Sequence, residues 1–372
     1  MTLRDTRRHM KMTADGRQAP LVTRNSQLSK AETVRQMLKR KAIPLLIALS
    51  PLGVGVVALF WGAYSVQPLL VAQIMASKIL GVGAVGGDLP ELAIVWNIRL
   101  PRIVLASLVG AALSAAGVTL QGVFRNPLVD PFILGLSAGA AFGCALSVAF
   151  LPALPVQVSA FLFSIVASFI AYGLAKHQGE VSRLPLVLSG VVVSAFFTAL
   201  VSILKFLVDP HKLASIVYWL LGSFSLADWS AVLAASLGVG AGGLVLFLTR
   251  WRLNALSMGD EEARALGINV ERDRLLLIAA ASLAVGSAVS VSGIIGWVGL
   301  MVPHLVRMII GPDHRQLMPY AMAAGATFMV FADTLARNLT SFDLPVGIIT
   351  ALSGAPFFIY LMNKGSRESW GR

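Results

Sequence analysis

Charged residues are scarce in this sequence, and their scarcity determines the class of protein. Asp, Glu, Lys and Arg make up 13% of its 372 residues, whereas soluble domains carry about 25%. Hydrophobic residues make up 56% of the chain, and the mean hydropathy is +0.78. The composition therefore indicates an integral membrane protein rather than a soluble domain.

Cysteine is almost absent, and histidine is rare. The single cysteine, Cys144, excludes a disulfide framework and a cysteine-rich metal site. The five histidines show none of the spacings typical of zinc ligands. We therefore expect no metal and no cofactor.

Signals of catalysis are also missing. No stretch fits the G-x-x-x-x-G-K-[ST] pattern of a nucleotide-binding P-loop. The run 135–139 (GLSAG) fits the G-x-S-x-G nucleophile pattern, but that pattern requires a preceding strand, and here it lies in an apolar helical segment. Helix packing through small residues is the better explanation, and we expect a non-catalytic membrane protein.

Acidic residues inside the apolar segments are nearly absent. Asp333 is the main candidate, and intramembrane acids are what a proton relay requires. This argues against an ion-coupled secondary transporter, which stays as the alternative from another class. A membrane-embedded enzyme would need converging Ser, His, Asp or metal ligands, and the sequence offers none.

The apolar segments predict an all-α membrane protein with about ten transmembrane helices, since about 20 residues cross the hydrocarbon core. The eighth segment is too short to cross unaided, and its start at Pro303 is uncertain. The predicted spans are 43–64, 103–123, 132–150, 156–175, 185–207, 230–249, 275–297, 303–311, 317–336 and 345–363.

The distribution of Lys and Arg predicts that both termini are cytoplasmic. With the N-terminus inside, 24 of the 30 basic residues fall on the cytoplasmic side, as the positive-inside rule requires. Residues 1–42 alone hold eleven Lys and Arg against three acids, so we expect a basic cytoplasmic extension rather than a signal peptide. The membrane domain would span 43–363, with a cytoplasmic tail at 364–372.

One hydrophilic segment interrupts the apolar chain. Residues 250–274 contain five arginines and five acids, a density that no bilayer core accepts, so the segment should lie in water between two spans. Three acids at 260–262 suit the first turn of a short helix, and Gly267 suits its end. We expect a surface for a soluble partner, with a solvated connector as the alternative.

A weak internal repeat has an offset of 176 residues. Small residues and a proline in 110–127 align with equivalent residues in 286–303. The two copies would cross the membrane in opposite directions, as the inverted repeats of transporters do.

Three long stretches resemble one family. They are RLPR at 99–102 followed by LVGAALSAAGVTLQGVFRNPLVDPFILGLSAGAAFG, then 292–319, and then 332–362. This pattern is similar to the FecCD-type permease subunits of ATP-binding-cassette (ABC) importers for iron chelates (siderophores, heme) and vitamin B12. The resemblance covers about residues 44–363 and leaves the basic extension outside.

The resemblance implies a type II importer architecture in the bacterial inner membrane. It implies a homodimer, or pairing with a sister chain, two copies of an ATPase subunit on the cytoplasmic side and a periplasmic substrate-binding protein outside, with no nucleic-acid partner. The coupling surface for the ATPase would consist of Met258, Gly259, Asp260, Glu261, Glu262, Ala263, Arg264, Ala265, Leu266 and Gly267. The arginines that dock the binding protein would be Arg99, Arg102 and Arg337, which could alternatively anchor helix ends by snorkelling.

The cargo implied by the resemblance is an iron chelate, because of the family's breadth. The same machine importing vitamin B12 or an oxyanion such as molybdate is the alternative. Nothing in 185–229 separates these cargoes.

Overall fold

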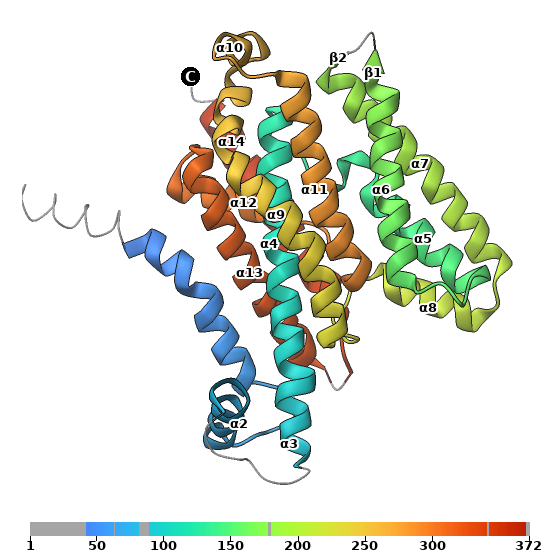
Figure 1. Ribbon diagram of the computed structural model, residues 1–372, viewed down its shortest axis with the longest axis vertical. Coiled ribbons are helices and arrows are strands. Elements are labelled where there is room, and N and C mark those ends of the chain that lie inside the picture. Colours follow the sequence, from blue (N-terminus) through green and yellow to red (C-terminus); the bar gives the residue numbers. More distant parts are fainter. Residues whose placement is uncertain (1–41, 63, 82–88, 178–179, 341, 370–372) are drawn as a thin grey trace, which may run out of the picture. The chain divides into compact units, whose positions relative to one another are not determined.

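The computed structural model describes residues 42–62, 64–81, 89–177, 180–340 and 342–369, and helices account for most of them (Figure 1). Contacts divide the chain into the units Met1–Leu45 and Leu46–Arg372, and the packing below concerns the second. The predicted basic extension 1–42 lies, except for its last residue, outside the described residues. The same holds for the last three residues of the predicted tail 364–372.

The elements follow one another as helices with short connections, and a hairpin of two-residue strands joins α6 to α7. The first helix covers Ala42–Phe60. The others are α2 (Pro68–Leu80), α3 (Pro90–Leu92), the π-helix η1 (Ala93–Arg99), α4 (Leu100–Phe124), the 3-10 helix η2 (Pro131–Leu134), α5 (Leu136–Phe150), α6 (Val156–Ala175), β1 (Lys176–His177), β2 (Glu180–Val181), α7 (Arg183–Leu207), α8 (Pro210–Leu220), α9 (Trp229–Met258), α10 (Asp260–Ala265), α11 (Val270–Ser292), α12 (Val298–Ile310), α13 (His314–Leu339) and α14 (Val346–Ser369).

Each of the ten apolar segments predicted from the sequence coincides with a helix. Among the described residues, six helices are long and apolar enough to cross a membrane, and four apolar helices are shorter. The eighth segment was misjudged, because α12 begins at Val298 and contains Pro303 in its interior. Pro303 is buried, and a helix-breaking residue is tolerated where protein covers the backbone. Helices α2 and α8 were not predicted.

Helix α4 lies at the centre of the bundle and packs against α9, α11, α12 and α13. Its small residues permit close approach: a Cβ on Gly110 would lie 2.2 Å from the carbonyl oxygen of Gly325, and one on Gly117 would lie 1.9 Å from that of Gly299. Because apolar side chains gain nothing by leaving lipid for protein, such close backbone contact supplies the packing energy between membrane helices.

The stretch 135–139 also serves helix packing. It forms the start of α5, and η2 rather than a strand precedes it. A Cβ on Gly139 would lie 2.3 Å from the carbonyl oxygen of Phe163 in α6. The structure therefore supports packing rather than a nucleophile at this stretch.

Two sets of short elements mark opposite ends of the unit. Helix α10 and the β1–β2 hairpin lie at one end, and α2 and α3 lie at the other (Figure 1). The predicted coupling residues include α10 and so belong to the first end. Arg99 is the last residue of η1, which directly follows α3.

Candidate functional site

The predicted coupling residues 258–267 form a short helix between two long ones. Met258 ends α9, and α10 covers Asp260–Ala265. Gly267 adopts a left-handed φ of +80°, which glycine tolerates without a Cβ penalty. The amide of Ile268 donates to the carbonyl of Ala263 at 3.0 Å and so closes the helix. The predicted glycine stop is confirmed, although the helix ends one residue earlier than expected.

One face of this segment packs against the protein, and the other is open. Ala263 is fully buried, whereas Met258 and Leu266 are 61% and 62% exposed. The other exposed members are Glu261, Glu262, Arg264, Ala265 and Gly267. Two large apolar side chains beside two exposed acids give this end of the molecule a mixed surface, which is typical of protein interfaces.

Asp260 connects α10 to three other helices. Its Oδ1 accepts hydrogen bonds from Arg125 at 2.8 Å and from Arg183 at 2.6 Å, and its Oδ2 accepts one from Arg274 at 2.9 Å. Arg125 follows α4, Arg183 begins α7, and Arg274 lies in the first turns of α11. One carboxylate thus joins the ends of α4, α7 and α11.

The three arginines keep Asp260 ionised. Partial burial alone would raise the pKa of Asp260, but hydrogen bonds and charges from Arg274 and Arg183 outweigh it and hold the pKa below its usual value. A lowered pKa means that the carboxylate stays charged at neutral pH and well into the acid range. The contribution of these ion pairs to the free energy of unfolding is therefore fully present above about pH 4. It is lost only as the pH falls through the lowered pKa of Asp260.

The sequence did not predict this arrangement of Asp260. The carboxylate of Asp260 was expected to interact with the dipole of its own helix, and this expectation included no contact with arginines from other helices. Arg125, Arg183 and the arginines of 250–274 are among the 24 basic residues that the positive-inside count places on the cytoplasmic side, and this was the available signal. Their meeting at one oxygen required the tertiary fold.

The charged segment 250–274 is less loop-like than expected. Helix α9 continues to Met258 and α11 begins at Val270, so only 259–269 connects them. Arg252 pairs with Asp273 at 2.5 Å, and Arg264 pairs with Glu271 at 2.7 Å. Because these charges neutralise one another across two adjacent helix ends, the helices extend through a segment that the charge density alone assigned to a water-exposed connection.

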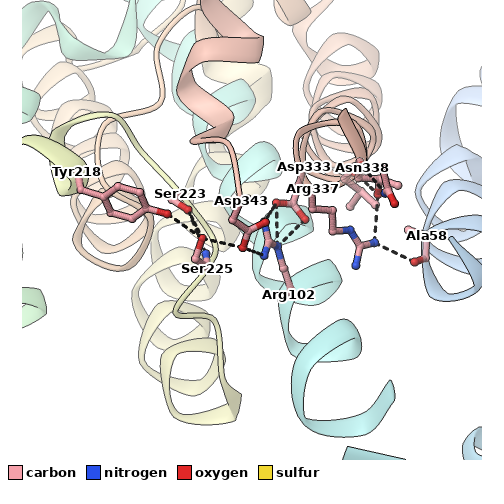
Figure 2. Close-up of polar contacts among 11 residues, drawn as sticks. Ala58, Arg102, Tyr218, Ser223, Ser225, Asp333, Arg337, Asn338 and Asp343 are labelled. Carbon is pink, nitrogen blue, oxygen red and sulfur yellow. Dashed lines mark hydrogen bonds and ion pairs between the residues drawn. The ribbon is translucent and has the colours of Figure 1, made fainter. Parts of the chain in front are cut away.

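The predicted docking arginines lie together and line a common pocket of about 410 Å³. Arg102 is the most constrained, because two carboxylates hold its guanidinium (Figure 2). Its Nε donates to both oxygens of Asp333 at 2.9 and 3.0 Å, and its Nη1 donates to Asp343 at 2.7 Å. Arg102 is 7% exposed and Asp333 is 2% exposed, whereas Asp343 is 36% exposed.

The other two arginines bind backbone carbonyls instead of acids. Arg99 donates to the carbonyls of Leu59, at 2.7 Å, and of Tyr64. Arg337 donates to the carbonyl of Ala58 at 2.9 Å (Figure 2), and its buried Nε has no hydrogen-bond partner in the part of the chain that the structure describes. Within the described residues no carboxylate pairs with either one.

Counting the described arginines of the pocket and the carboxylates that pair with them, the pocket has a surplus of positive charge. Arg99, Arg102 and Arg337 contribute three charges, and Asp333 and Asp343 neutralise two of them. A single carboxylate entering the pocket would balance the third. The sequence identified the three arginines and singled out Asp333, but it missed Asp343, because an acid in a connection gives no signal until the fold brings it to Arg102.

A larger cavity of about 770 Å³ lies between α5, α6, α8, α9 and α11. Its lining is mostly apolar and includes Trp219, Tyr218 and several serines, with no charged side chain among the described residues. Such a lining suits an uncharged or largely apolar guest.

Comparison with known proteins then decides the family. The model of the FecCD transport family matches residues 47–364. The chain belongs to this family. The family member described here is a multi-pass membrane permease, a transport subunit of an ABC transporter.

Relatives support the same assignment. This permease is 47% identical over 269 residues to a probable iron chelatin transport system permease protein of Helicobacter pylori, covering 72% of this chain and 82% of that protein. It is 40% identical over 316 residues to the molybdate import system permease protein of Haemophilus influenzae, covering 84% and 92%. A solved inward-facing structure of a putative metal-chelate type ABC transporter superposes with a TM-score of 0.75 at 38% identity, covering 87% of this chain and 99% of that one. The all-α permease architecture expected from the sequence is thereby confirmed.

Proposed function

We propose that this permease imports an iron chelate across the bacterial inner membrane, with both termini in the cytoplasm. An ATPase subunit docks on residues 258–267, and a periplasmic substrate-binding protein docks on the arginine pocket. The observation that carries this proposal is the anchorage of α10 by Asp260, because it connects an exposed helix to the ends of three others. Helix α10 lies at one end of the unit, and α3, which leads through η1 to Arg99, lies at the other (Figure 1).

Transport then follows from rigid coupling. Movement of a docked ATPase pushes on α10 and on the exposed side chains that flank it, Met258 and Leu266. Because Asp260 joins α10 to the ends of α4, α7 and α11, those helices receive the displacement together. Packed helices respond as rigid bodies, so a small motion at one end can change access at the other.

On the opposite side, the surplus charge of the arginine pocket provides the complement to an acidic side chain. Charge-assisted hydrogen bonds between guanidinium and carboxylate are strong and geometrically specific. The three arginines proposed for docking, Arg99, Arg102 and Arg337, thus fit a partner that presents acids. We also propose that two copies of this chain and two ATPase subunits form the working assembly.

The properties of the 770 Å³ cavity favour an organic chelate as cargo. Its lining holds no cationic side chain among the described residues to compensate a small oxyanion, and an unpaired buried charge is costly. The identity to an iron chelatin permease points the same way. Molybdate is the second candidate because of the relative that imports it, and vitamin B12 stays an alternative from the sequence.

The coupling site is tested by reversing the charge of its exposed acids. In Glu261→Lys with Glu262→Lys, we expect loss of the co-purifying ATPase subunit, because the exposed acids would then repel their partner groups. The matched control is Arg272→Gln, an exposed residue outside 258–267. Full ATPase assembly in the double variant would contradict the assignment.

The docking site is tested without disturbing the buried ion pair. Arg99→Gln with Arg337→Gln removes two charges and leaves Arg102 with both carboxylates. We expect the stimulation of ATP hydrolysis by the binding protein to be lost, with Lys78→Gln as control because Lys78 lies in the last turn of α2 and outside the pocket. Undiminished stimulation would rule out the pocket as the docking site.

The cargo is tested separately, by metal analysis of the ligand that the binding protein carries.

A further inference from the structure

Asp343 pairs with Arg102 inside the arginine pocket. Its Oδ2 accepts from Arg102 Nη1 at 2.7 Å, and its Oδ1 accepts from Nη2 at 3.2 Å. The side chain lines the pocket together with Arg99 and Arg337. The pocket is therefore already occupied by an acid of the chain itself.

The two acids on Arg102 differ in how readily they can leave. Asp333 is 2% exposed and engages Nε and Nη2, so its removal would strand a buried guanidinium. Asp343 is 36% exposed and lies in the connection between α13 and α14. Water can solvate a partly exposed carboxylate as it leaves, which makes Asp343 the exchangeable partner.

Asp343 also holds a second connection. Ser225, between α8 and α9, donates to Asp343 Oδ2 at 3.0 Å, and the hydroxyls of Ser223 and Tyr218 lie 2.7 and 3.1 Å from Ser225 Oγ (Figure 2). Tyr218, Ser223 and Ser225 all line the 770 Å³ cavity. A continuous polar chain therefore runs from the arginine pocket to the cavity wall.

We propose that Asp343 is an internal latch: it occupies Arg102 and holds the α8–α9 connection until a carboxylate of the docking partner replaces it. Exchange of one carboxylate for another keeps the charge on Arg102 balanced. It also releases Ser225, which loosens the wall of the cavity on the side where cargo would arrive. This proposal rests on the proposed docking function and adds a competing residue and a route to the cavity.

The latch predicts that removing the internal competitor strengthens docking. Asp343→Asn keeps the shape of the side chain but gives up its charge, so we expect the binding protein to dock about tenfold more tightly to the full transporter in nanodiscs. Glu91→Gln is the matched control, because Glu91 contacts Tyr64 at the same pocket but pairs with no arginine among the described residues. Docking of Asp343→Asn that equals or falls below that of the control would overturn the latch.

A second measurement needs no partner. With Cys144→Ala as background, the half-buried Ala227 is replaced by Cys, and its reaction rate with a maleimide reports the freedom of the α8–α9 connection. We expect Asp343→Asn to raise this rate several-fold and Glu91→Gln to leave it unchanged. Ser225→Ala, which keeps the Arg102–Asp343 pair, should raise the rate as well. This variant replaces Asp343→Asn in the test if Asp343→Asn does not fold. No increase in a folded variant would overturn the latch.

Failure of the latch and failure of the docking function give different results. If the double variant Arg99→Gln with Arg337→Gln and the single variant Asp343→Asn both dock like the wild type, the docking function is wrong and the latch with it. If the double variant loses docking while Asp343→Asn docks like the wild type, the pocket stands and only the latch is wrong.

Discussion

At the scale of single residues, a few carboxylates control where the cationic side chains of this permease point. Asp260 gathers three arginines at one end of the bundle, and Asp333 fixes Arg102 within the core. Burying an ion pair brings little net stability, yet breaking one by removing a single partner is costly. Replacing one partner of the buried pair Arg102–Asp333 should therefore destabilise the protein more than replacing both.

Asp333→Asn should lower the free energy of unfolding by about 3 to 5 kcal/mol, because the buried Arg102 loses its fully desolvated counter-ion. The matched variant is Arg102→Met with Asp333→Leu, which removes both charges and should recover most of the loss. Thermal unfolding of purified protein in detergent measures both. Equal melting temperatures for Asp333→Asn and the wild type would show that Asp343 alone suffices for Arg102.

At the scale of elements, α10 is held by its anchor rather than by its own length. Six residues are too few for a helix to be stable alone in water. Its buried contact is Ala263, and its anchor is the carboxylate of Asp260. The helix should consequently depend on that one side chain more than on its exposed acids.

Asp260→Asn should increase hydrogen exchange at the amides of 260–268, because the helix loses its three charged partners. Glu261→Gln is the control, since Glu261 is exposed and makes no ion pair among the described residues. Mass spectrometry of protein in nanodiscs at fixed pH compares the two. If both variants exchange alike, the anchorage does not depend on the charge of Asp260.

At the scale of the whole molecule, the proposed function depends on polarity across the membrane. The coupling surface and the arginine pocket must face opposite compartments for an ATPase and a binding protein to act on the same chain. The surplus of Lys and Arg on one side supports the assignment of that side to the cytoplasm.

We expect Leu266→Cys, with Cys144→Ala as background, to react with a membrane-impermeant maleimide only after the cells are permeabilised. Phe342→Cys, close to the arginine pocket, should react in intact cells. Both side chains are well exposed, at 62% and 65%, so accessibility within the protein does not separate them. The reverse pattern would invert the topology and remove both docking assignments.

The sequence by itself determined the membrane class, the ten apolar helical segments and the family, because these depend on composition, run length and local motifs. It also placed the end of the short helix α10 within one residue, since glycine and the acids act locally. Only the tertiary structure decided that Asp260 meets Arg125, Arg183 and Arg274, and that Asp343 faces Arg102 across 241 positions of chain. The physical reason is that an ion pair is specified by the distance between two side chains, and that distance follows from the packing of the helices rather than from the neighbours of either residue.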